Sequence, residues 1–392
     1  MIGRIVHLAK YYVRYLRLRK LSAAAYKKGP YRKVLVLGYA AIGDFIFLLP
    51  ALEALRAGLP KARIAFVCNR YPTTTDFLPA SGLVDDIWEF DAKAGKDARA
   101  AFHEQLRRAG FDAVLLSYGT PISAFSEALL GIPVRIGHCY PVGYRRKVAA
   151  GEHERRLVLN RPIAGTLGEN AIERNLQLVR ELGIAAPLLT DRRPRIPHPE
   201  EARSAALRCA PEGTKTIGVH LGSPNTQYGK LWAPQRWGEV CLRLRQAYGV
   251  RVAVIGGGED RKNFQAFKEI FVGDCVDLVG KGGLLDSLAV LRRCAVFLAG
   301  DTGLAKCAIA LGVPTVTVWG PTDPQELQPP WDADKHLNIS HAVPCAPCVQ
   351  LGMPKDGVEN YTRCGHRRCL AELSPEAVME AVRGKYDSLL RS

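Results

Sequence analysis

Short apolar runs alternate with amphipathic stretches along the first half of the chain. The runs predict strands at 33–37, 63–68, 86–90 and 112–117, and the amphipathic stretches predict helices at 44–58 and 96–109. Continuous apolar runs, rather than strict alternation, are typical of strands that are buried on both faces. Strands that alternate with helices indicate a parallel sheet wrapped by helices, which right-handed crossovers turn into a Rossmann-like half.

The same pattern restarts in the second half, after a stretch at 187–199 that holds four prolines. The predicted elements there are strands at 215–220, 251–255, 295–298 and 315–319, and helices at 234–247, 261–271 and 284–292. We therefore predict an α/β protein with two Rossmann-like doubly wound domains that face a central cleft. The expected parts are an arm (1–32), a first domain (33–186), a linker (187–212), a second domain (213–372) and a C-terminal helix (373–392).

Between the two series, periodicity is lost at 138–170, which we interpret as a long basic loop. Arg145, Arg146 and Lys147 lie in it, followed by three further arginines. Irregular segments of this length are either functional or mobile. The basic residues are therefore either a solvated surface or contacts to an anionic acceptor.

The net charge of +16 indicates an anionic partner, which is nucleic acid, a membrane surface or an acidic ligand. Ten Lys and Arg residues and no acidic residue lie in the first 33 positions, where apolar residues follow helical spacing. Such a helix suits an anionic membrane surface, although a solvated or packed arm has the same pattern. No apolar run approaches 18 residues, and no signal peptide is expected. The eleven cysteines are mostly scattered through apolar runs, which fits a reducing cytoplasm.

One stretch of the second half combines a strand, a turn and a helix start. The strand at 295–298 leads into Gly300-Asp301-Thr302-Gly303, where Thr302 can cap a helix and Gly303 lets a ligand approach the backbone. A helix that begins here directs free N–H groups and a positive dipole end at whatever lies above the sheet. The stretch is either an ordinary capped turn or a diphosphate site.

Other strand ends of the second half also carry polar or glycine-rich loops. The loops contain Ser223, Asn225 and Lys230, then Glu259, and then Gly280 and Lys281. Because carboxyl ends of parallel strands meet at one edge, we expect these residues to form one nucleotide-sized site. Lys230 would neutralise phosphate, Ser223 and Thr302 would donate hydrogen bonds, and Glu259 would accept from a ribose hydroxyl. In the first half, Asp44 either caps its helix or takes a proton from an attacking hydroxyl.

These motifs together resemble glycosyltransferase family 9, the ADP-heptose lipopolysaccharide heptosyltransferases. The resemblance covers residues 33–382 and rests on Gly43-Asp44 with Pro50, Lys230 with Trp232, Gly280 with Leu284, Asp301-Thr302-Gly303 with Ala308, Gly312-Val-Pro314, and Gly320-Pro-Thr322. It implies a GT-B fold and an inverting transfer from ADP-heptose to an anionic lipopolysaccharide-core-like acceptor without a catalytic metal. It also implies action in the cytoplasm, on the cytoplasmic face of the inner membrane.

The resemblance assigns roles to single residues. It implies that Asp44 is the general base and that Ser223, Lys230, Glu259 and the Asp301-Thr302-Gly303 turn bind the donor. One position departs from the family, because Lys306 stands where the family usually has His. A lysine still meets phosphate, but without the geometry or titration of an imidazole, so the donor sugar is left open.

Four late cysteines form a second constellation. Cys345 and Cys348 make a C-x2-C pair, and Cys364 and Cys369 make a C-x4-C pair fifteen residues later. Thiolates at this spacing can close a structural zinc or iron site, and reduced cysteines without a metal are the alternative. The cluster lies outside the strand-end loops, so no metal is expected in catalysis.

Two other functions stay open at this point. A nucleic-acid-binding α/β protein would use the +16 charge, although its basic residues lack interleaved aromatic residues. A catalytically silent nucleotide-sugar-binding protein, or a transferase for another nucleotide sugar, fits the Lys306 departure. His103, His138 and His220 are interpreted as structural or solvated rather than catalytic. Trp232, Trp237 and Trp319 are interpreted as packing residues, although one at a strand end could border the donor site.

Overall fold

The structure is a computed structural model that describes residues 30–38, 41–68, 76–91, 95–117, 122–140, 146–166, 168–185, 193–197, 206, 211, 213–222, 228–350, 353–354 and 364–391. Its internal contacts divide the chain into two compact units. The first unit contains Met1–Ala41 and Phe47–Asp191, and the second contains Ile42–Ile46 and Arg192–Ser392. The division at Asp191 falls within 187–212.

The first unit is built on a six-stranded parallel sheet with the order β3-β2-β1-β4-β5-β6. Its strands are β1 (Lys33–Leu37), β2 (Arg63–Cys68), β3 (Asp86–Glu89), β4 (Ala113–Leu116), β5 (Val134–Cys139) and β6 (Arg161–Ala164). The strand order reverses between β1 and β4, which is the topological switch point at which ligands bind in open α/β sheets. The chain after β1 leads into the helix that carries Asp44.

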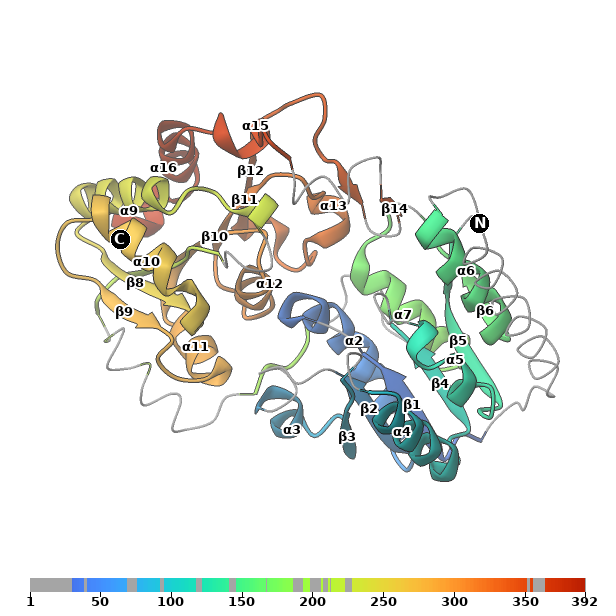
Figure 1. The fold of residues 1–392 in the computed structure, drawn as a ribbon. Coiled ribbons are helices and arrows are strands. Elements are labelled where there is room, and N and C mark those ends of the chain that lie inside the picture. Colours follow the sequence, from blue (N-terminus) through green and yellow to red (C-terminus); the bar gives the residue numbers. More distant parts are fainter. Residues whose placement is uncertain are drawn as a thin grey trace. The chain divides into compact units, whose positions relative to one another are not determined.

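Helices cover this first sheet. They are α2 (Ile42–Gly58), α3 (Leu78–Ser81), α4 (Lys96–Ala109), α5 (Ser126–Leu129), α6 (Arg146–Val158) and α7 (Ala171–Glu181), with a short 3-10 helix η2 (Ile122–Ala124) (Figure 1). One core joins apolar residues of β1, β2 and β4 to Leu106 of α4, Phe125 beside α5 and Val158 of α6. Outside this core, α7 binds α2 through Asn175, whose Nδ2 donates to the carbonyl oxygen of Phe47 at 3.1 Å.

The interpretation of 138–170 as a long loop is wrong, because β5, α6 and β6 occupy most of it. The reason is that buried positions of these elements hold charged residues. Arg135 of β5 is fully buried and donates to the carbonyl oxygens of Ile132 and Val158. Glu152 of α6 is also buried and accepts the backbone N–H of Tyr140 at 2.9 Å. A hydrophobic periodicity cannot reveal elements whose inward face is partly charged.

The second unit repeats the architecture with the strand order β12-β11-β10-β7-β8-β9. Its parallel strands are β7 (Thr216–His220), β8 (Arg251–Gly256), β9 (Val276–Val279), β10 (Cys294–Gly300), β11 (Thr315–Trp319) and β12 (His336–Ser340). A separate hairpin pairs β13 (Val349–Gln350) with β14 (Met353–Pro354). The order reverses between β7 and β10, so the loops after these two strands lie at the switch point of this sheet.

The helices of the second unit include the chain's last element. They are α9 (Pro234–Tyr248), α10 (Arg261–Ile270), α11 (Leu284–Leu291), α12 (Gly303–Ala310), α13 (Pro324–Leu327), α15 (Arg368–Ala371) and α16 (Pro375–Arg391), with 3-10 helices η3 (Tyr228–Lys230), η4 (Gly258–Asp260) and η5 (Ala333–Lys335). Helices α9, α10 and α16 pack together on one side of the sheet (Figure 1). The Tyr386 hydroxyl of α16 lies 2.8 Å from the carbonyl oxygen of Thr315 and 2.7 Å from that of Lys335, and these two acceptors share its one proton, which ties the last helix to β11.

Two parallel six-stranded sheets wrapped by helices are the GT-B α/β architecture that the sequence predicted. In the second sheet, two strands escaped prediction because they are short and interrupted by polar residues. Strand β9 is the four residues Val-Asp-Leu-Val and is mostly half-buried, and β12 reads His-Leu-Asn-Ile-Ser.

Candidate active site

The carboxylate of Asp301 collects three donors at the carboxyl end of β10. Lys230 Nζ lies 2.7 Å from Oδ2, Thr322 Oγ1 donates to the same oxygen at 2.7 Å, and Lys306 Nζ donates to Oδ1. The donors come from η3, from the loop after β11 and from α12, so this cluster joins three parts of the sheet edge. Asp301 is 3% exposed and Lys306 is also 3% exposed, so water does not solvate this ion pair.

Electrostatics keep the Asp301 carboxyl ionised. Burial alone would raise its pKa, but the charges and hydrogen bonds of Lys230 and Lys306 outweigh burial and hold the pKa well below its ordinary value. Burial lowers the pKa of Lys306, against the attraction of Asp301. The Lys230 and Lys306 ammonium groups and the Asp301 carboxylate sum to one positive charge, and the carboxylate of Asp44 also attracts Lys306.

The environment of Lys306 explains how a lysine is accommodated within a buried helix. Every residue of α12 from Leu304 to Ala310 is buried, so the side chain at 306 has no access to bulk water. Its ammonium lies 4.3 Å from the ring centroid of Trp319, a cation–π contact, while it donates to Asp301. The sequence predicted that Lys306 meets a phosphate, whereas the structure directs it onto Asp301.

Thr302 caps α12, as the sequence predicted. Its hydroxyl oxygen accepts the backbone N–H of Ala305 at 3.4 Å. The same hydroxyl is 3.0 Å from Nδ1 of His220, whose Nε2 is 3.2 Å from Oδ2 of Asp260. His220 is buried rather than solvated, and its bridge from the β7 end to both the α12 cap and η4 was missed. The only sequence signal for it is the position of His220 at the end of β7.

The loops after β8 and β9 pack against each other. The backbone N–H of Gly280 donates to the carbonyl oxygen of Gly256 at 2.9 Å. Gly280 has φ +66°, and a side chain there would come within 3.0 Å of the Gly258 backbone, so glycine is required. Glu259 is exposed in η4, as a group that accepts from a ribose hydroxyl must be. These two loops thus form a second part of the same sheet edge.

The remaining predicted donor residues are Lys281, Ser223, Asn225 and Gly303. Lys281 forms an ion pair with Asp277 at 3.0 Å and stays exposed, so it does not join the Asp301 cluster. Ser223 and Asn225 lie outside the described residues. Gly303 is the first residue of α12, directly after the Thr302 cap.

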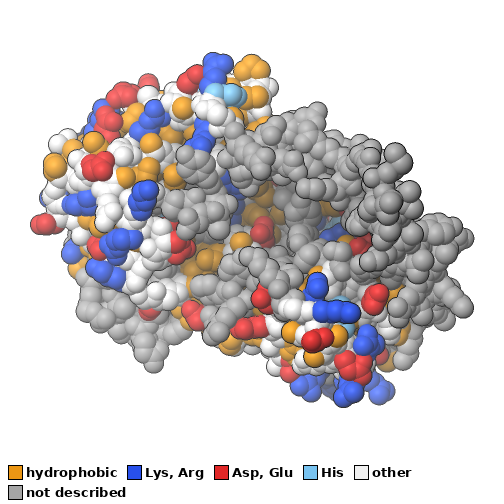
Figure 2. Space-filling model, in the orientation of Figure 1, with side chains coloured by type: hydrophobic (Ala, Val, Ile, Leu, Met, Phe, Trp, Pro, Cys, Tyr) orange, Lys and Arg blue, Asp and Glu red, His pale blue; other side chains and the backbone are white. Residues whose placement is uncertain are grey.

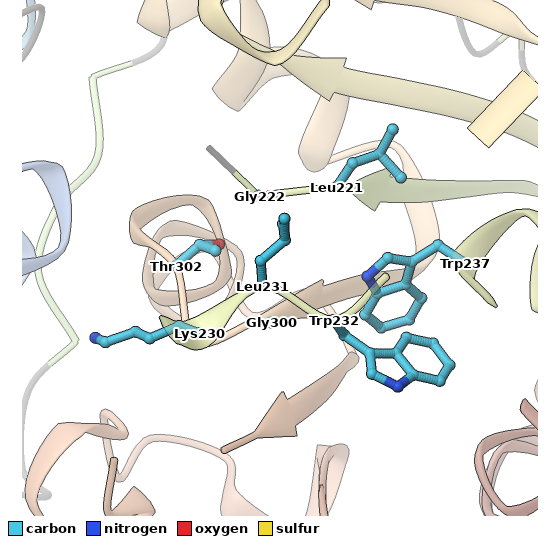
Figure 3. A pocket seen from close by; sticks show the side chains of 8 residues that line it. All are labelled: Leu221, Gly222, Lys230, Leu231, Trp232, Trp237, Gly300 and Thr302. Carbon is cyan, nitrogen blue, oxygen red and sulfur yellow. The ribbon is translucent and has the colours of Figure 1, made fainter. Parts of the chain in front are cut away.

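The residues beside Lys230 pack tightly. Figure 3 shows that the Lys230 amino group points away from Trp232 and Trp237, with Thr302 nearby on α12. A small cavity of about 10 Å³ lies between these residues and Leu221. Both indole rings are buried and meet edge to face, with centroids 4.6 Å apart, which confirms their interpretation as packing residues.

Asp44 lies in the first turn of α2, within the Ile42–Ile46 stretch that belongs to the second unit, and is exposed. Ala41 is the N-cap residue of this helix, so Asp44 is not the N-cap. An acidic residue in a first helical turn is stabilised by the helix dipole. Of the three predicted acceptor residues, Arg145 lies outside the described residues, and Arg146 and Lys147 begin α6.

The four late cysteines are free thiols in one region of the second unit. Burial, together with the nearby Cys348, Cys345 and Cys364, raises the pKa of Cys369 to about 11. The backbone N–H of Arg367 donates to Cys364 Sγ at 3.4 Å. Among the described residues, however, no three His, Cys, Asp or Glu side chains are placed to hold a metal ion. The sulfurs are thus near one another without forming a coordination shell.

The described surface does not concentrate one sign of charge on the face drawn in Figure 2. Basic and acidic side chains are mixed over the coloured parts of that face. Within the part of the chain that the structure describes, no helix is both long enough and apolar enough to cross a bilayer.

Comparison with known proteins agrees with this architecture. The chain is 23% identical over 336 residues to lipopolysaccharide heptosyltransferase 1 of Pseudomonas aeruginosa, covering 81% of this chain and 86% of that protein. The fold matches the glycosyl transferase family 9 structure from Veillonella parvula with TM-score 0.70 and 20% identity, over 93% of this chain and 99% of that one. It matches E. coli ADP-heptose lps heptosyltransferase II with TM-score 0.64 and 19% identity, over 91% and 98% of the two chains.

A more distant structural relative is a protein that contains iron. It is the dodecameric iron-containing heptosyltransferase TibC in complex with ADP-D-β-D-heptose, with TM-score 0.54 and 15% identity, over 94% of this chain and 80% of that one. The family model for glycosyltransferase family 9 (heptosyltransferase) matches residues 99–358, which is more than half of the chain. The chain is therefore a glycosyltransferase that belongs to glycosyltransferase family 9, the heptosyltransferases.

Proposed function

We propose that this enzyme transfers a heptose from ADP-heptose to an anionic, lipopolysaccharide-core-like acceptor with inversion at the anomeric carbon. The observation that carries the proposal is the Asp301 cluster at the switch point of the second sheet, which holds one net positive charge beside the start of α12. The names of the P. aeruginosa and E. coli relatives support heptose and lipopolysaccharide as substrates.

The donor diphosphate would bind where charge and backbone donors coincide. The free N–H groups of the first turn of α12 favour an anion, and the Lys230 ammonium adds a full positive charge. Glu259 would accept from the ribose, with Gly280 and Lys281 at the nucleoside side. Ser223 and Asn225, which follow β7 in the sequence, would complete the donor contacts.

The reaction would be a single displacement. Asp44 would take the proton of an acceptor hydroxyl while that oxygen forms a bond to the anomeric carbon. The bond from this carbon to the diphosphate oxygen would break, and ADP would leave with its electron pair. Lys230 and the α12 N-terminus would stabilise the growing charge on the leaving group, so catalysis needs no metal. Attack from the opposite side of the leaving group inverts the anomeric configuration.

The basic residues of the first half suggest where the acceptor and the membrane bind. Arg145, Arg146 and Lys147 would contact the anionic groups of the acceptor. We also propose that the basic arm, 1–32, binds the cytoplasmic face of the inner membrane, where the lipid-linked acceptor lies. Vesicle sedimentation with and without anionic lipid tests this, and equal retention of a variant that lacks the arm would contradict it.

We propose a structural metal, with iron tested first, at the four late cysteines and outside the reaction. The four thiols suit iron or zinc by residue type and spacing, although their described placement requires the sulfurs to draw together. Elemental analysis of purified protein should give one metal per chain, and Cys364→Ser should lose it. Cys275→Ser, a half-buried cysteine elsewhere in the unit, is the matched control and should keep the metal.

The test of the proposed reaction pairs a donor screen with two variants. Wild type should transfer from ADP-heptose in preference to other nucleotide sugars, and Asp44→Asn should lose about 10²–10⁴-fold in kcat, as removal of a general base does. Asp97→Asn, an exposed aspartate in the first turn of α4, is the matched control and should keep full activity. Donor binding without transfer would instead support a catalytically silent protein. Transfer by Asp44→Asn at the wild-type rate would remove Asp44 as the base.

A further inference from the structure

A second, larger cavity lies at the carboxyl ends of β11 and β12. Its volume is about 660 Å³, which falls within the ~300–1,000 Å³ of typical small-molecule sites. Its walls are the β11–α13 connection, the end of β12 and the loop at 341–347. No residue that the sequence analysis assigned to donor, acceptor or metal lines this cavity.

The cavity adjoins the proposed diphosphate site through Thr322 and through Trp319, whose ring centroid lies 4.3 Å from Lys306 Nζ. Thr322 lines it, and the hydroxyl of Thr322 donates to Asp301 Oδ2 at 2.7 Å. The strand order places β11 and β12 on one side of β10, and β7, β8 and β9 on the other. Because Glu259 and Gly280 follow β8 and β9, the cavity lies on the side of the diphosphate cluster opposite to the proposed nucleoside side.

The lining excludes a strongly anionic ligand. Neither Lys nor Arg is among the described residues that line the cavity, although the chain as a whole carries a net charge of +16. A phosphate or carboxylate would lack a cationic partner and would lie near the carboxylate of Asp323. The cavity thus differs in kind from the Lys230 site next to it.

The lining does suit a hydroxyl-rich ligand. Asp323, Gln325, Ser340 and His341 supply groups that accept or donate hydrogen bonds to hydroxyls. Apolar walls contributed by prolines and Val343 can pack against the C–H faces of a sugar ring. This mixture of apolar walls and a few convergent polar groups is what a neutral sugar unit requires.

The walls are held in place by contacts outside the cavity. The backbone N–H of Cys348 donates to the carbonyl oxygen of Pro321 at 2.8 Å, which fixes the loop over the end of β11. His341 Nε2 lies 3.1 Å from Glu372 Oε2. Leu370 packs so closely on Gly320 that a side chain there would come within 2.8 Å of it. A site that is formed before its ligand arrives saves ordering entropy on binding.

We propose that this cavity binds an uncharged, hydroxyl-rich sugar unit during glycosyl transfer. The inference rests on the proposed function for its ligands and extends it to a site outside the donor and acceptor residues named above. The sugar is either the transferred sugar of the donor or a sugar of the acceptor, since both present the same chemistry.

The test fills the cavity without removing a polar contact. Ala342 is an exposed residue of the lining, and Ala342→Trp places an indole in the space. Ala377→Trp, the same change at an exposed alanine of α16 that does not line the cavity, is the matched control. For both variants and wild type, calorimetry measures the Kd of ADP, of ADP-heptose and of a purified inner-core oligosaccharide, and circular dichroism checks folding.

Ala342→Trp should weaken ADP-heptose or the oligosaccharide by about tenfold or more while the Kd of ADP stays within roughly twofold. Loss of ADP-heptose binding assigns the cavity to the transferred sugar, and loss of oligosaccharide binding assigns it to the acceptor. Equal binding of all three ligands by both variants would overturn the inference, as would an equal loss of ADP. If wild type itself does not bind ADP-heptose, the proposed donor is wrong, which is a separate result. The oligosaccharide measurements alone then test whether the cavity binds a sugar.

Discussion

The Asp301 cluster makes a quantitative prediction about the stability of the second unit. In Asp301→Asn, the carboxylate becomes a neutral amide of the same shape, and the two ammonium groups lose their counter-charge. The Lys230 side chain is 17% exposed and can turn toward water, but the Lys306 side chain is 4% exposed and is enclosed by α12. The penalty therefore falls mainly on Lys306.

The expected sizes follow from burial. Removing one partner of a buried ion pair costs about 3–5 kcal/mol in unfolding free energy, because a charge is left buried and unpaired. In a Lys306→Met background that charge is absent, and Asp301→Asn should cost only ~1–2 kcal/mol for its weakened hydrogen bonds. The double-mutant cycle should then give a coupling energy of roughly 2–3 kcal/mol between Asp301 and Lys306.

Equilibrium unfolding in urea, followed by tryptophan fluorescence, measures these differences. Four of the five tryptophans, at positions 232, 237, 319 and 331, belong to the second unit and are buried, so the signal reports on that unit. A coupling energy below about 0.5 kcal/mol would refute the reasoning, since that is the scatter of independent sites. If Asp301→Asn lowers the unfolding free energy equally in the wild-type and Lys306→Met backgrounds, the Asp301 carboxylate does not stabilise the Lys306 ammonium.

Three further predictions concern other contacts. Burial lowers the pKa of His138 to about 4, whereas the same imidazole in the unfolded chain is protonated below pH ~6.5. Lowering the pH from 7.5 to 5.5 therefore favours the unfolded chain. Over this range the unfolding free energy of wild type should fall by about 1.4 kcal/mol more than that of His138→Gln. Thr302→Ala should cost ~1–2 kcal/mol in urea unfolding and weaken ADP binding, whereas Thr302→Ser, which keeps the cap, should do neither. Tyr386→Phe should cost about 1–2 kcal/mol because the carbonyls of Thr315 and Lys335 lose the one proton that they share, and Tyr248→Phe, whose hydroxyl donates to the 46% exposed side chain of Asp387, should cost under ~0.5 kcal/mol. A Tyr248→Phe cost equal to that of Tyr386→Phe would contradict the burial argument.

Elements with apolar inward faces could be predicted from the sequence. The predicted strands 33–37, 63–68 and 315–319 coincide with β1, β2 and β11, because buried parallel strands are continuous apolar runs. The β5–α6–β6 region could not be predicted, because Arg135 and Glu152 replace apolar residues on its buried faces. Arg135 donates to Val158 and Glu152 accepts from Tyr140, and no local sequence pattern indicates such distant partners.

In the candidate site, too, local features could be predicted from the sequence and long-range contacts could not. The Asp301-Thr302-Gly303 turn and the capped start of α12 are local features, so the sequence predicted both. The bridge from His220 to Thr302 spans 82 positions, and the contact from Lys230 to Asp301 spans 71. Such pairs depend on which strands are neighbours, and the adjacency of β7 and β10 is a property of the sheet order rather than of either loop.

The sheet order also explains what the lysine at position 306 changes. With a neutral imidazole at this position, Lys230 and Asp301 would cancel, and the cluster would have no net charge. With Lys306, the three groups keep one positive charge in a place that water does not reach. A buried charge acts through a low dielectric and so attracts a nearby diphosphate more strongly than an exposed one does. The departure from the family's usual histidine thus adds a positive charge to the cluster, and Asp301 and Asp44 attract that charge within the fold.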